Sequence, residues 1–464
     1  MENRFHLKEN HTSVSTELMA GLATFMAMAY IVFVAPSMIA DAVGAGAGEE
    51  AAQQAANGAF VATCLSAFIG TGLMAFLANL PLAQAVGVGS CGFFAYTIIL
   101  KSGYSYPAAL ALVFLSGLFF IICTVTGLRE KINSALPKTI KAAISAGLGI
   151  FIAFIGLQNA GIIVPDASTG VTLAAFSQFS SSESVRSAVL AIIGILLLTI
   201  LWRKGVRGAI LYSILILSVL AIPFGVGEFP SKESFIGLGT VFSDFKEVSF
   251  LAFSRGFKEL FRDASASVAS LFSVIVLSFT FFLSDLFNTL GTLIGATAGT
   301  PFVREDGSIK NMNRAMLCDA VATTAGAMLG APTVTTFAEA GVGIRQGGRT
   351  GLSALVTALL FLLILLAAPV AKLIPYAATA PALIFVGVLM TAGSIHDMDF
   401  SDMTNAVPAF LTLILIPLSY NIATGIAFGM ISYVVVKACM GRWREISPYL
   451  VVFSILFFIS YALV

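Results

Sequence analysis

The chain has 464 residues, of which 58% are hydrophobic and only 11% are charged. Soluble domains carry about 25% charged residues, so this composition excludes a protein that faces water over its whole surface. The net charge of +1 argues against a nucleic acid partner. The three histidines (His6, His11 and His396) lie outside the apolar runs, which argues against haem or zinc in the membrane. We therefore expect an all-α polytopic protein of the lipid bilayer with no cofactor.

Fourteen apolar segments follow one another along the chain, and lipid forces each of them into a helix because it offers backbone groups no partner. The first seven are 16–40, 58–80, 84–101, 107–127, 138–163, 187–203 and 207–227. The last seven, after a mixed polar stretch, are 264–298, 314–330, 332–346, 350–374, 377–394, 405–419 and 421–439. A short apolar run at 449–463 is expected to lie along the membrane or dip into it.

The charges in the loops fix the orientation, because cytoplasmic loops carry an excess of Lys and Arg. Basic residues follow segments four, six, eight, ten and fourteen, all on the side of the N-terminus: Arg129, Lys131, Lys138, Lys141, Arg203, Lys204, Arg207, Arg304, Lys310, Arg314, Arg345, Arg349, Arg442 and Arg444. The first loop on the other side, 41–57, has acidic residues but no Lys or Arg. We predict a cytoplasmic N-terminus in the inner or plasma membrane.

Seven segments per half is an odd number, so the two halves insert in opposite orientations, as in many secondary transporters. The repeats are 1–227 and 264–439, with an extracytoplasmic linker at 228–263 and an apolar tail at 440–464. Segment three begins PLAQAVGVG (81–89) and segment ten begins PTVTTFAEAGVG (332–343). Both are Pro-led and rich in Gly, which predicts two discontinuous helices.

Acidic residues inside the segments are the sharpest functional signal, because a charge at the bilayer centre costs at least ~2.5 kcal/mol. In segment eight a polar face contains Ser278, Asp285, Asn288, Thr289 and Thr292. It predicts a binding site, with a seam between two helices as the alternative.

Glu339 follows Pro332 and Thr333, which we expect to start a helix whose first N–H groups are free for a ligand. Thr336 shares the face of Glu339, and a Glu339–Arg345 ion pair is the alternative role for this acid. Asp319, near the start of segment nine, is expected to be a structural anchor.

Aromatic residues lie beside the acids and the helix breaks: Phe93, Phe94, Phe287 and Phe337. Two carboxylates with aromatic faces suit a flat, neutral ligand that donates hydrogen bonds. A carboxylate in a site of low dielectric can also carry a proton. The residues alone therefore indicate a polar ligand and leave proton coupling open.

The motifs resemble those of the AzgA-like purine permeases, a branch of the nucleobase–cation symporters related to the uracil and xanthine permeases. They are ELMAGLATFMAMAYIVFV (17–34), GFFAY (92–96), DLFNTLGTLIG (285–295) and TVTTFAEAGVGIRQGGRTGL (333–352). The resemblance implies a core domain (segments 1–4 and 8–11), a gate domain (5–7 and 12–14) and elevator-like, proton-coupled uptake of guanine, hypoxanthine or adenine. H⁺ is the expected coupling ion with Na⁺ as an alternative, and a homodimer is an assembly that this fold allows.

The resemblance also implies the site residues. The expected substrate-binding residues are Asp285, Glu339, Asn288, Phe93, Phe94, Cys91, Phe287, Thr336 and Ala340, of which Glu339 and Asp285 would couple the proton. The chain departs from the family pattern at Ala35, Gln84, Val86, Cys91, Asn288 and Ala340. These changes remove one acid and two amides, so the favoured base stays open.

Three other functions compete with this reading. An anion carrier on the same fold predicts a cationic site, yet Arg345 is the one basic residue near Asp285 and Glu339 in the sequence. An enzyme within the membrane would need a nucleophile and a base, and the segments contain no histidine. A channel is disfavoured because two separated carboxylates beside broken helices suit a site that can be occluded.

The orientation can be tested with reporter fusions. Fusions after Lys204 and after Lys310 should both report a cytoplasmic location, and a fusion near Glu183 should report the opposite side. Opposite locations for the first two fusions would contradict the inverted repeat.

Overall fold

The computed structural model describes residues 2–227, 237–264, 268–297, 300–304, 309–371 and 373–463. Among these residues, eight helices are long and apolar enough to cross a membrane, and several shorter apolar helices accompany them. Large apolar side chains point outward from these helices, as at Leu196 (60% exposed) and Val219 (67% exposed). Such a surface is stable in lipid and not in water, so the chain is a helical polytopic membrane protein.

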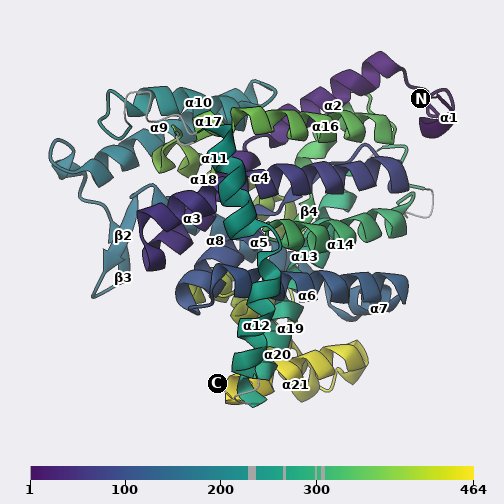
Figure 1. The fold of residues 1–464 in the computed structure, drawn as a ribbon. Coiled ribbons are helices and arrows are strands. Elements are labelled where there is room, and N and C mark those ends of the chain that lie inside the picture. Colours follow the sequence, from purple (N-terminus) through teal and green to yellow (C-terminus); the bar gives the residue numbers. More distant parts are fainter. Residues whose placement is uncertain are drawn as a thin grey trace.

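The helices follow the predicted segments along most of the chain (Figure 1). The first half contains α1 (Glu2–Phe5), α2 (Val14–Met28), α3 (Ile31–Ala47), α4 (Glu49–Leu73), η1 (Met74–Ala78), α5 (Val88–Gly92), η2 (Phe93–Lys101), α6 (Tyr106–Val125), α7 (Leu128–Ala135), α8 (Lys138–Asn159), η3 (Phe176–Gln178), α9 (Glu183–Arg203) and α10 (Ala209–Ala221). The second contains α11 (Leu238–Asp244), η5 (Phe245–Ser249), α12 (Ala252–Ala264), α13 (Val268–Thr297), α14 (Met312–Leu329), η6 (Ala338–Ala340), α15 (Gly341–Arg345), α16 (Gly351–Leu363), η7 (Ile364–Ala367), α17 (Ala368–Ala371), α18 (Tyr376–Ile395), α19 (Met403–Ser419), α20 (Ile422–Cys439), η8 (Trp443–Glu445) and α21 (Pro448–Leu463).

Two short sheets correct the all-α prediction. Strand β1 (Gln84–Val86) pairs antiparallel with β4 (Val334–Thr336), and β2 (Ile163–Asp166) forms a hairpin with β3 (Gly170–Leu173). The prediction that Pro332 and Thr333 start a helix is therefore wrong. Val334, Thr335 and Thr336 are all β-branched, which favours extended backbone. Pairing with β1 also satisfies backbone polar groups that a broken helix would leave without partners in lipid.

A threonine hydroxyl holds the first residue of each strand in the β1–β4 sheet. Thr71 donates to the carbonyl oxygen of Gln84 (2.8 Å) and accepts from its N–H (2.9 Å). Thr323 makes the same pair of contacts with Val334, at 2.9 and 3.1 Å. Thr71 lies in the second predicted segment and Thr323 in the ninth, so one threonine from each half of the chain performs the same task.

Segment one is a single candidate span, Val14–Ala47, as predicted, but its helix is irregular within that span. The irregularity is at Ala29–Tyr30, between α2 and α3. Helix α3 contacts β1 there, and α2 contacts η6, which is far away in the sequence. No Gly or Pro marks the break in the sequence, since Pro36 lies inside α3. The break brings the side chain of Tyr30 to the centre of the protein, where it is fully buried.

The linker between the halves forms helices that cross the others. Figure 1 shows α11 and α12 running almost perpendicular to α4, α14 and α16. One face of α12 packs on α6, with Phe253 stacked on Phe114 (ring centroids 4.5 Å apart), while Arg255 is exposed. An amphipathic helix of this kind lies along a membrane surface. Residues 228–236 of the predicted linker are outside the described residues.

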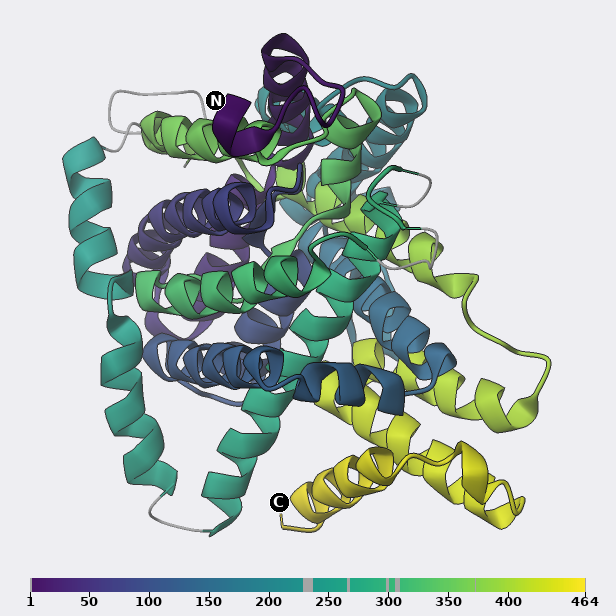
Figure 2. The same cartoon turned by 90° about the vertical axis from the view of Figure 1, so that its right-hand side faces the viewer.

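The spanning helices pack into two groups. The first group is α2, α3, α4, α6, α13, α14 and α16, together with the two short helices that follow β1 and β4. The second group is α8, α9, α10, α18, α19 and α20. Figure 2 shows the last helices, coloured yellow, at the opposite edge of the molecule from the N-terminus. Helix α21, the predicted apolar tail, packs on α20 and α13.

The threonine contacts generate a stability prediction. Thr71→Val and Thr323→Val each leave a buried peptide N–H and C=O without a partner, so each should lower the free energy of unfolding by about 2–4 kcal/mol. Thr199→Val is the matched control, since Thr199 bonds only to Ile195 of its own helix. Thermal unfolding of the purified protein measures the difference. Equal midpoints for all three variants would show that the strands do not depend on these hydroxyls.

Candidate functional site

A cavity of about 670 Å³ lies between the two groups of helices, at the place where the two short helices begin. A volume of this size is typical of sites for small molecules. The first group contributes Tyr30, Gly87, Val88, Gly89, Phe287, Asn288, Leu290, Gly291, Thr292, Met312, Thr336, Phe337, Ala338, Glu339, Val342 and Arg345. The second group contributes Lys138, Lys141, Ala142, Ser145, Trp202, Val386, Leu389, Met390, Gly393, Ser394 and Asp397.

Glu339 is the acid that the first group of helices contributes to the cavity lining. It lies in the first turn of the helix that follows β4, and its carboxylate accepts a hydrogen bond from the Tyr30 hydroxyl (3.1 Å). Its side chain is half-buried, whereas Tyr30 is fully buried and held by the break between α2 and α3. Tyr30 engages one carboxylate oxygen, which leaves the other to accept hydrogen bonds from a ligand.

Asn288 and Thr336 lie on neighbouring parts of the lining. The Asn288 amide donates to the Thr335 hydroxyl (3.2 Å), so its carbonyl oxygen stays available to a ligand. The Thr336 hydroxyl accepts from the Gln84 amide (3.2 Å), which fixes it in place. Phe287 and Phe337, which are 4% and 6% exposed, supply aromatic surface at the same place.

Asp285 does not line the cavity. It is fully buried on the side of α13 that faces α14, where its carboxyl contacts the Thr323 hydroxyl (2.8 Å). Among the described residues, its second oxygen Oδ1 has no hydrogen-bond partner. The polar face predicted for segment eight is therefore divided: Asn288 points to the cavity, and Asp285 points to the layer behind the strands.

Asp319 is the second acid of that layer. It accepts hydrogen bonds from the Gln84 amide (3.1 Å) and from the hydroxyls of Thr289 (2.8 Å) and Thr336 (3.5 Å). These contacts connect α13, α14 and both strands. The placement agrees with the anchor role expected for this residue.

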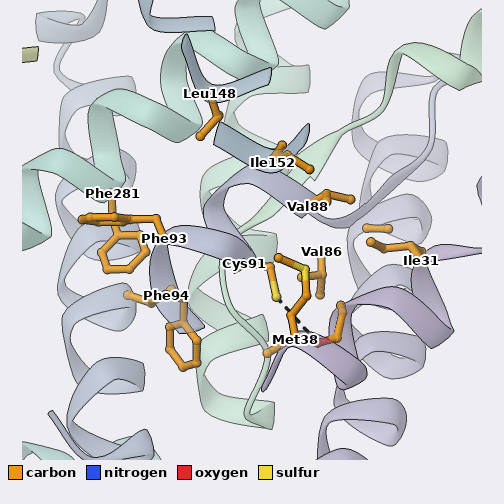
Figure 3. Close-up of a cluster of buried hydrophobic side chains, with 14 of the residues drawn as sticks. Ile31, Met38, Val86, Val88, Cys91, Phe93, Phe94, Leu148, Ile152 and Phe281 are labelled. Carbon is orange, nitrogen blue, oxygen red and sulfur yellow. Dashed lines mark hydrogen bonds between the residues drawn. The ribbon is translucent and has the colours of Figure 1, made fainter. Parts of the chain in front are cut away.

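Cys91, Phe93, Phe94 and Ala340, which were expected to bind substrate, are packed into the protein rather than against the cavity (Figure 3). The Cys91 thiol contacts the Ala35 carbonyl oxygen at 3.7 Å. The ring of Phe93 packs on Phe281 with centroids 4.8 Å apart, and that of Phe94 meets Tyr106 edge-on at 5.8 Å. All four residues support the short helices and do not reach the ligand space in this conformation.

A model of the Permease family matches residues 15–428 of this chain. The chain belongs to that family. It is 37% identical over 465 residues to guanine/hypoxanthine permease PbuO of Bacillus subtilis, covering 98% of this chain and 99% of that protein. It is 35% identical over 460 residues to adenine permease AdeQ of Escherichia coli, covering 99% and 96%. The resemblance to purine permeases is confirmed, and these relatives are transporters rather than enzymes.

Solved structures resemble this permease in fold. The transmembrane domain of a cyanobacterium bicarbonate transporter, BicA, superposes with a TM-score of 0.56 at 17% identity, covering 89% of this chain and 96% of that one. SLC26A9 superposes with a TM-score of 0.58 at 12% identity, covering 91% and 65%. At these identities the likeness concerns the fold alone.

The cavity of the permease opens at one end of its helices. Lys138, the first residue of α8, and Asp397, just beyond α18, line the same mouth with Lys141 and Arg345. Within the described part of the chain, no ion pair joins Arg345 to Glu339, so the pairing considered from the sequence is not formed. Three lining residues were not predicted from the sequence: Tyr30, Lys138 and Lys141. For Tyr30, a polar side chain in an otherwise apolar segment was the available signal.

Proposed function

We propose that this permease takes up a purine base, guanine, hypoxanthine or adenine, together with protons. The observation that carries the proposal is the half-buried carboxylate of Glu339 in a cavity that also contains the Asn288 amide and the rings of Phe287 and Phe337. A purine presents adjacent N–H donors to such acceptors and two π-faces to such rings. The names of the relatives support this substrate class.

The proposed topology is a seven-plus-seven inverted repeat of fourteen segments with a cytoplasmic N-terminus in the cell membrane. The positive loops support it, and so does the shared task of Thr71 and Thr323 in the two halves. In this orientation Lys138 and Asp397 are cytoplasmic, so the cavity faces inward.

The first group of helices would be the core domain, which carries Glu339, and the second the gate domain. Residues 1–227 and 264–439 would be the two repeats, with 228–263 outside the cell membrane and 440–464 as a tail. Transport would occur when the core moves past the gate and carries the cavity to the other side. The position of the cavity between the two groups, with Glu339 and Asn288 both on the first, supports this division.

The hydrogen bonds around Asp285 support it as a carrier of the coupling proton. The Thr323 hydroxyl has one hydrogen, yet it lies within hydrogen-bond distance of the Asp285 carboxyl, the Val334 carbonyl and the Val334 N–H. It accepts from the N–H. If the single hydroxyl hydrogen of Thr323 is donated to the Val334 carbonyl, the hydrogen in the contact with Asp285 must come from the Asp285 carboxyl, which is then protonated. Asp319, by contrast, receives donors only, which suits an ionised carboxylate.

This arrangement would couple the proton to the base through β4. When Asp285 loses its proton, Thr323 donates to the carboxylate, and the Val334 carbonyl loses its donor. The strand that leads to Thr336 and Glu339 is then held less firmly. Proton and base would therefore bind cooperatively, and by linkage each would raise the affinity for the other.

An anion carrier remains the second candidate, because Lys138, Lys141 and Arg345 give the cavity a cationic mouth. The carboxylate of Glu339 disfavours an anion deeper in the cavity, since like charges repel strongly where water is excluded. The neutral base is therefore preferred.

Substitution of the two acids separates binding from coupling. Glu339→Gln removes a charged acceptor and should weaken base binding by about 10- to 100-fold. Asp285→Asn keeps a donor for Thr323 at every pH, so it should bind the base but no longer accumulate it on a proton gradient. Radiolabelled hypoxanthine uptake into proteoliposomes, with a pH gradient or a sodium gradient, measures both effects. Asp166→Asn, at the end of β2 and far from the cavity lining, is the control.

Full accumulation by Asp285→Asn would remove this residue from coupling. Unchanged affinity in Glu339→Gln would move the base away from Glu339. Accumulation driven by sodium alone would replace H⁺ with Na⁺ as the coupling ion.

Ligand identity can be tested with a stabilisation panel, because a ligand at 100 times its Kd adds about 2.7 kcal/mol to the folded state. Guanine, hypoxanthine, adenine or xanthine should stabilise the purified permease more than uracil, sulfate or bicarbonate. Asn288→Asp should change the ranking among the bases, because Asn288 lines the cavity, whereas Cys91→Asn should leave the ranking unchanged. Stabilisation by an anion, with every base silent, would establish the second candidate instead.

A further inference from the structure

Four polar side chains meet at the end of the molecule opposite the mouth of the cavity. The Tyr96 hydroxyl donates to the Asp41 carboxylate (2.9 Å), and the Asn159 amide donates to the same carboxylate (3.1 Å) and to the Tyr96 oxygen (2.9 Å). The Tyr376 hydroxyl lies near the same carboxylate. We refer to Asp41, Tyr96, Asn159 and Tyr376 as the outer cluster.

The outer cluster joins the two groups of helices. Asp41 is on α3 and Tyr96 is on η2, both in the first group, whereas Asn159 ends α8 and Tyr376 begins α18 in the second. Next to the cluster, Thr97 and Lys101 of η2 donate to the backbone carbonyls of Tyr420 and Ser419, between α19 and α20. Among the described residues, several hydrogen bonds thus join the two groups at this end.

The position of the cluster is opposite to that of the mouth. Helix α8 begins with Lys138 at the mouth and ends with Asn159 in the cluster, and its 22 residues span about 33 Å. Helix α18 likewise starts with Tyr376 in the cluster and ends near Asp397 at the mouth. The two sites therefore lie at opposite faces of the membrane.

Between the cluster and the cavity, the groups are sealed by apolar contact. A Cβ atom placed on Gly89 would lie 2.5 Å from Leu148, and one on Gly92 would lie 3.3 Å from Ile155. Two glycines of the first group thus let the helix of the second group approach closely. Ile155 is only 1% exposed at this contact, so the two groups are closely packed there.

We propose that the outer cluster is the extracytoplasmic latch of the permease: it holds the inward-facing state, and Asp41 is the acceptor on which it depends. When the groups slide, all of its bonds between groups must break, and water can replace them because Asp41 and Asn159 are half-buried and Tyr376 is exposed. Apolar packing alone offers no such exchange. The inference rests on the proposed movement of the two groups, but it does not depend on which ligand is carried.

Cysteine accessibility in the ligand-free permease in nanodiscs tests the latch. The background is Cys439→Ser, since Cys439 is the exposed cysteine and Cys64, Cys91, Cys123 and Cys318 are buried. Ile155→Cys reports the sealed outer half, and Ser394→Cys, in a separate variant, reports the inner mouth. Adding Asp41→Ala should raise the maleimide reaction rate at position 155 at least tenfold and lower it at position 394.

Tyr376→Phe and Tyr96→Phe remove single hydroxyls and should shift both rates in the same directions by smaller factors, which decides the matter if Asp41→Ala fails to fold. Tyr212→Phe, which removes an exposed hydroxyl elsewhere, should change neither rate. Rates that stay constant, or that rise at both positions, would overturn the latch, because only a shift between two states moves them in opposite directions. The maleimide rates are measured without any base. If no base stabilised the permease in the ligand panel, the proposed substrate would be refuted, but the latch would not.

Discussion

Lipid gives a backbone N–H or C=O group no partner, and the architecture of this permease follows from how it satisfies that constraint at two broken helices. Strands β1 and β4 pair with each other, and Thr71 and Thr323 supply hydroxyls to their first residues. Both polypeptide segments can therefore stop being helical in the middle of the membrane. Each then begins a short helix at the same cavity, which positions Glu339 in the first turn of one of them.

The same arrangement separates the acids into two environments. Glu339 faces the cavity and Tyr30, whereas Asp285 and Asp319 lie in a buried layer of threonines behind the strands. Two departures from the family pattern contact each other, since the Cys91 thiol lies against the Ala35 carbonyl. A third, Gln84, bonds through its amide to Asp319. The departures thus alter the support of the strands and short helices more than the cavity wall, where Asn288 is the changed residue.

Hydropathy was enough to predict a polytopic helical protein, because lipid imposes strong rules on composition, and the Pro-led, Gly-rich starts of segments three and ten predicted two discontinuous segments. They did not predict that these segments start as strands, since pairing between residues 84 and 336 is a distant contact. Helical periodicity found the polar face of α13 but not its division. Asp285 and Asn288 are three residues apart on one helix, but α14 covers Asp285 and leaves Asn288 facing the cavity. Phe93 and Phe94 were misplaced for the same reason, because packing partners are not visible in a local pattern.

The central claim is that Glu339 is the residue that binds the base. A structure of the permease with hypoxanthine or guanine bound tests it most directly. We expect the ring in the cavity, with an N–H of the base within about 3 Å of the Glu339 carboxylate and a ring face against Phe287 or Phe337. A base held against Cys91, Phe93 and Phe94, with the Glu339 carboxylate bonded only to Tyr30, would contradict it.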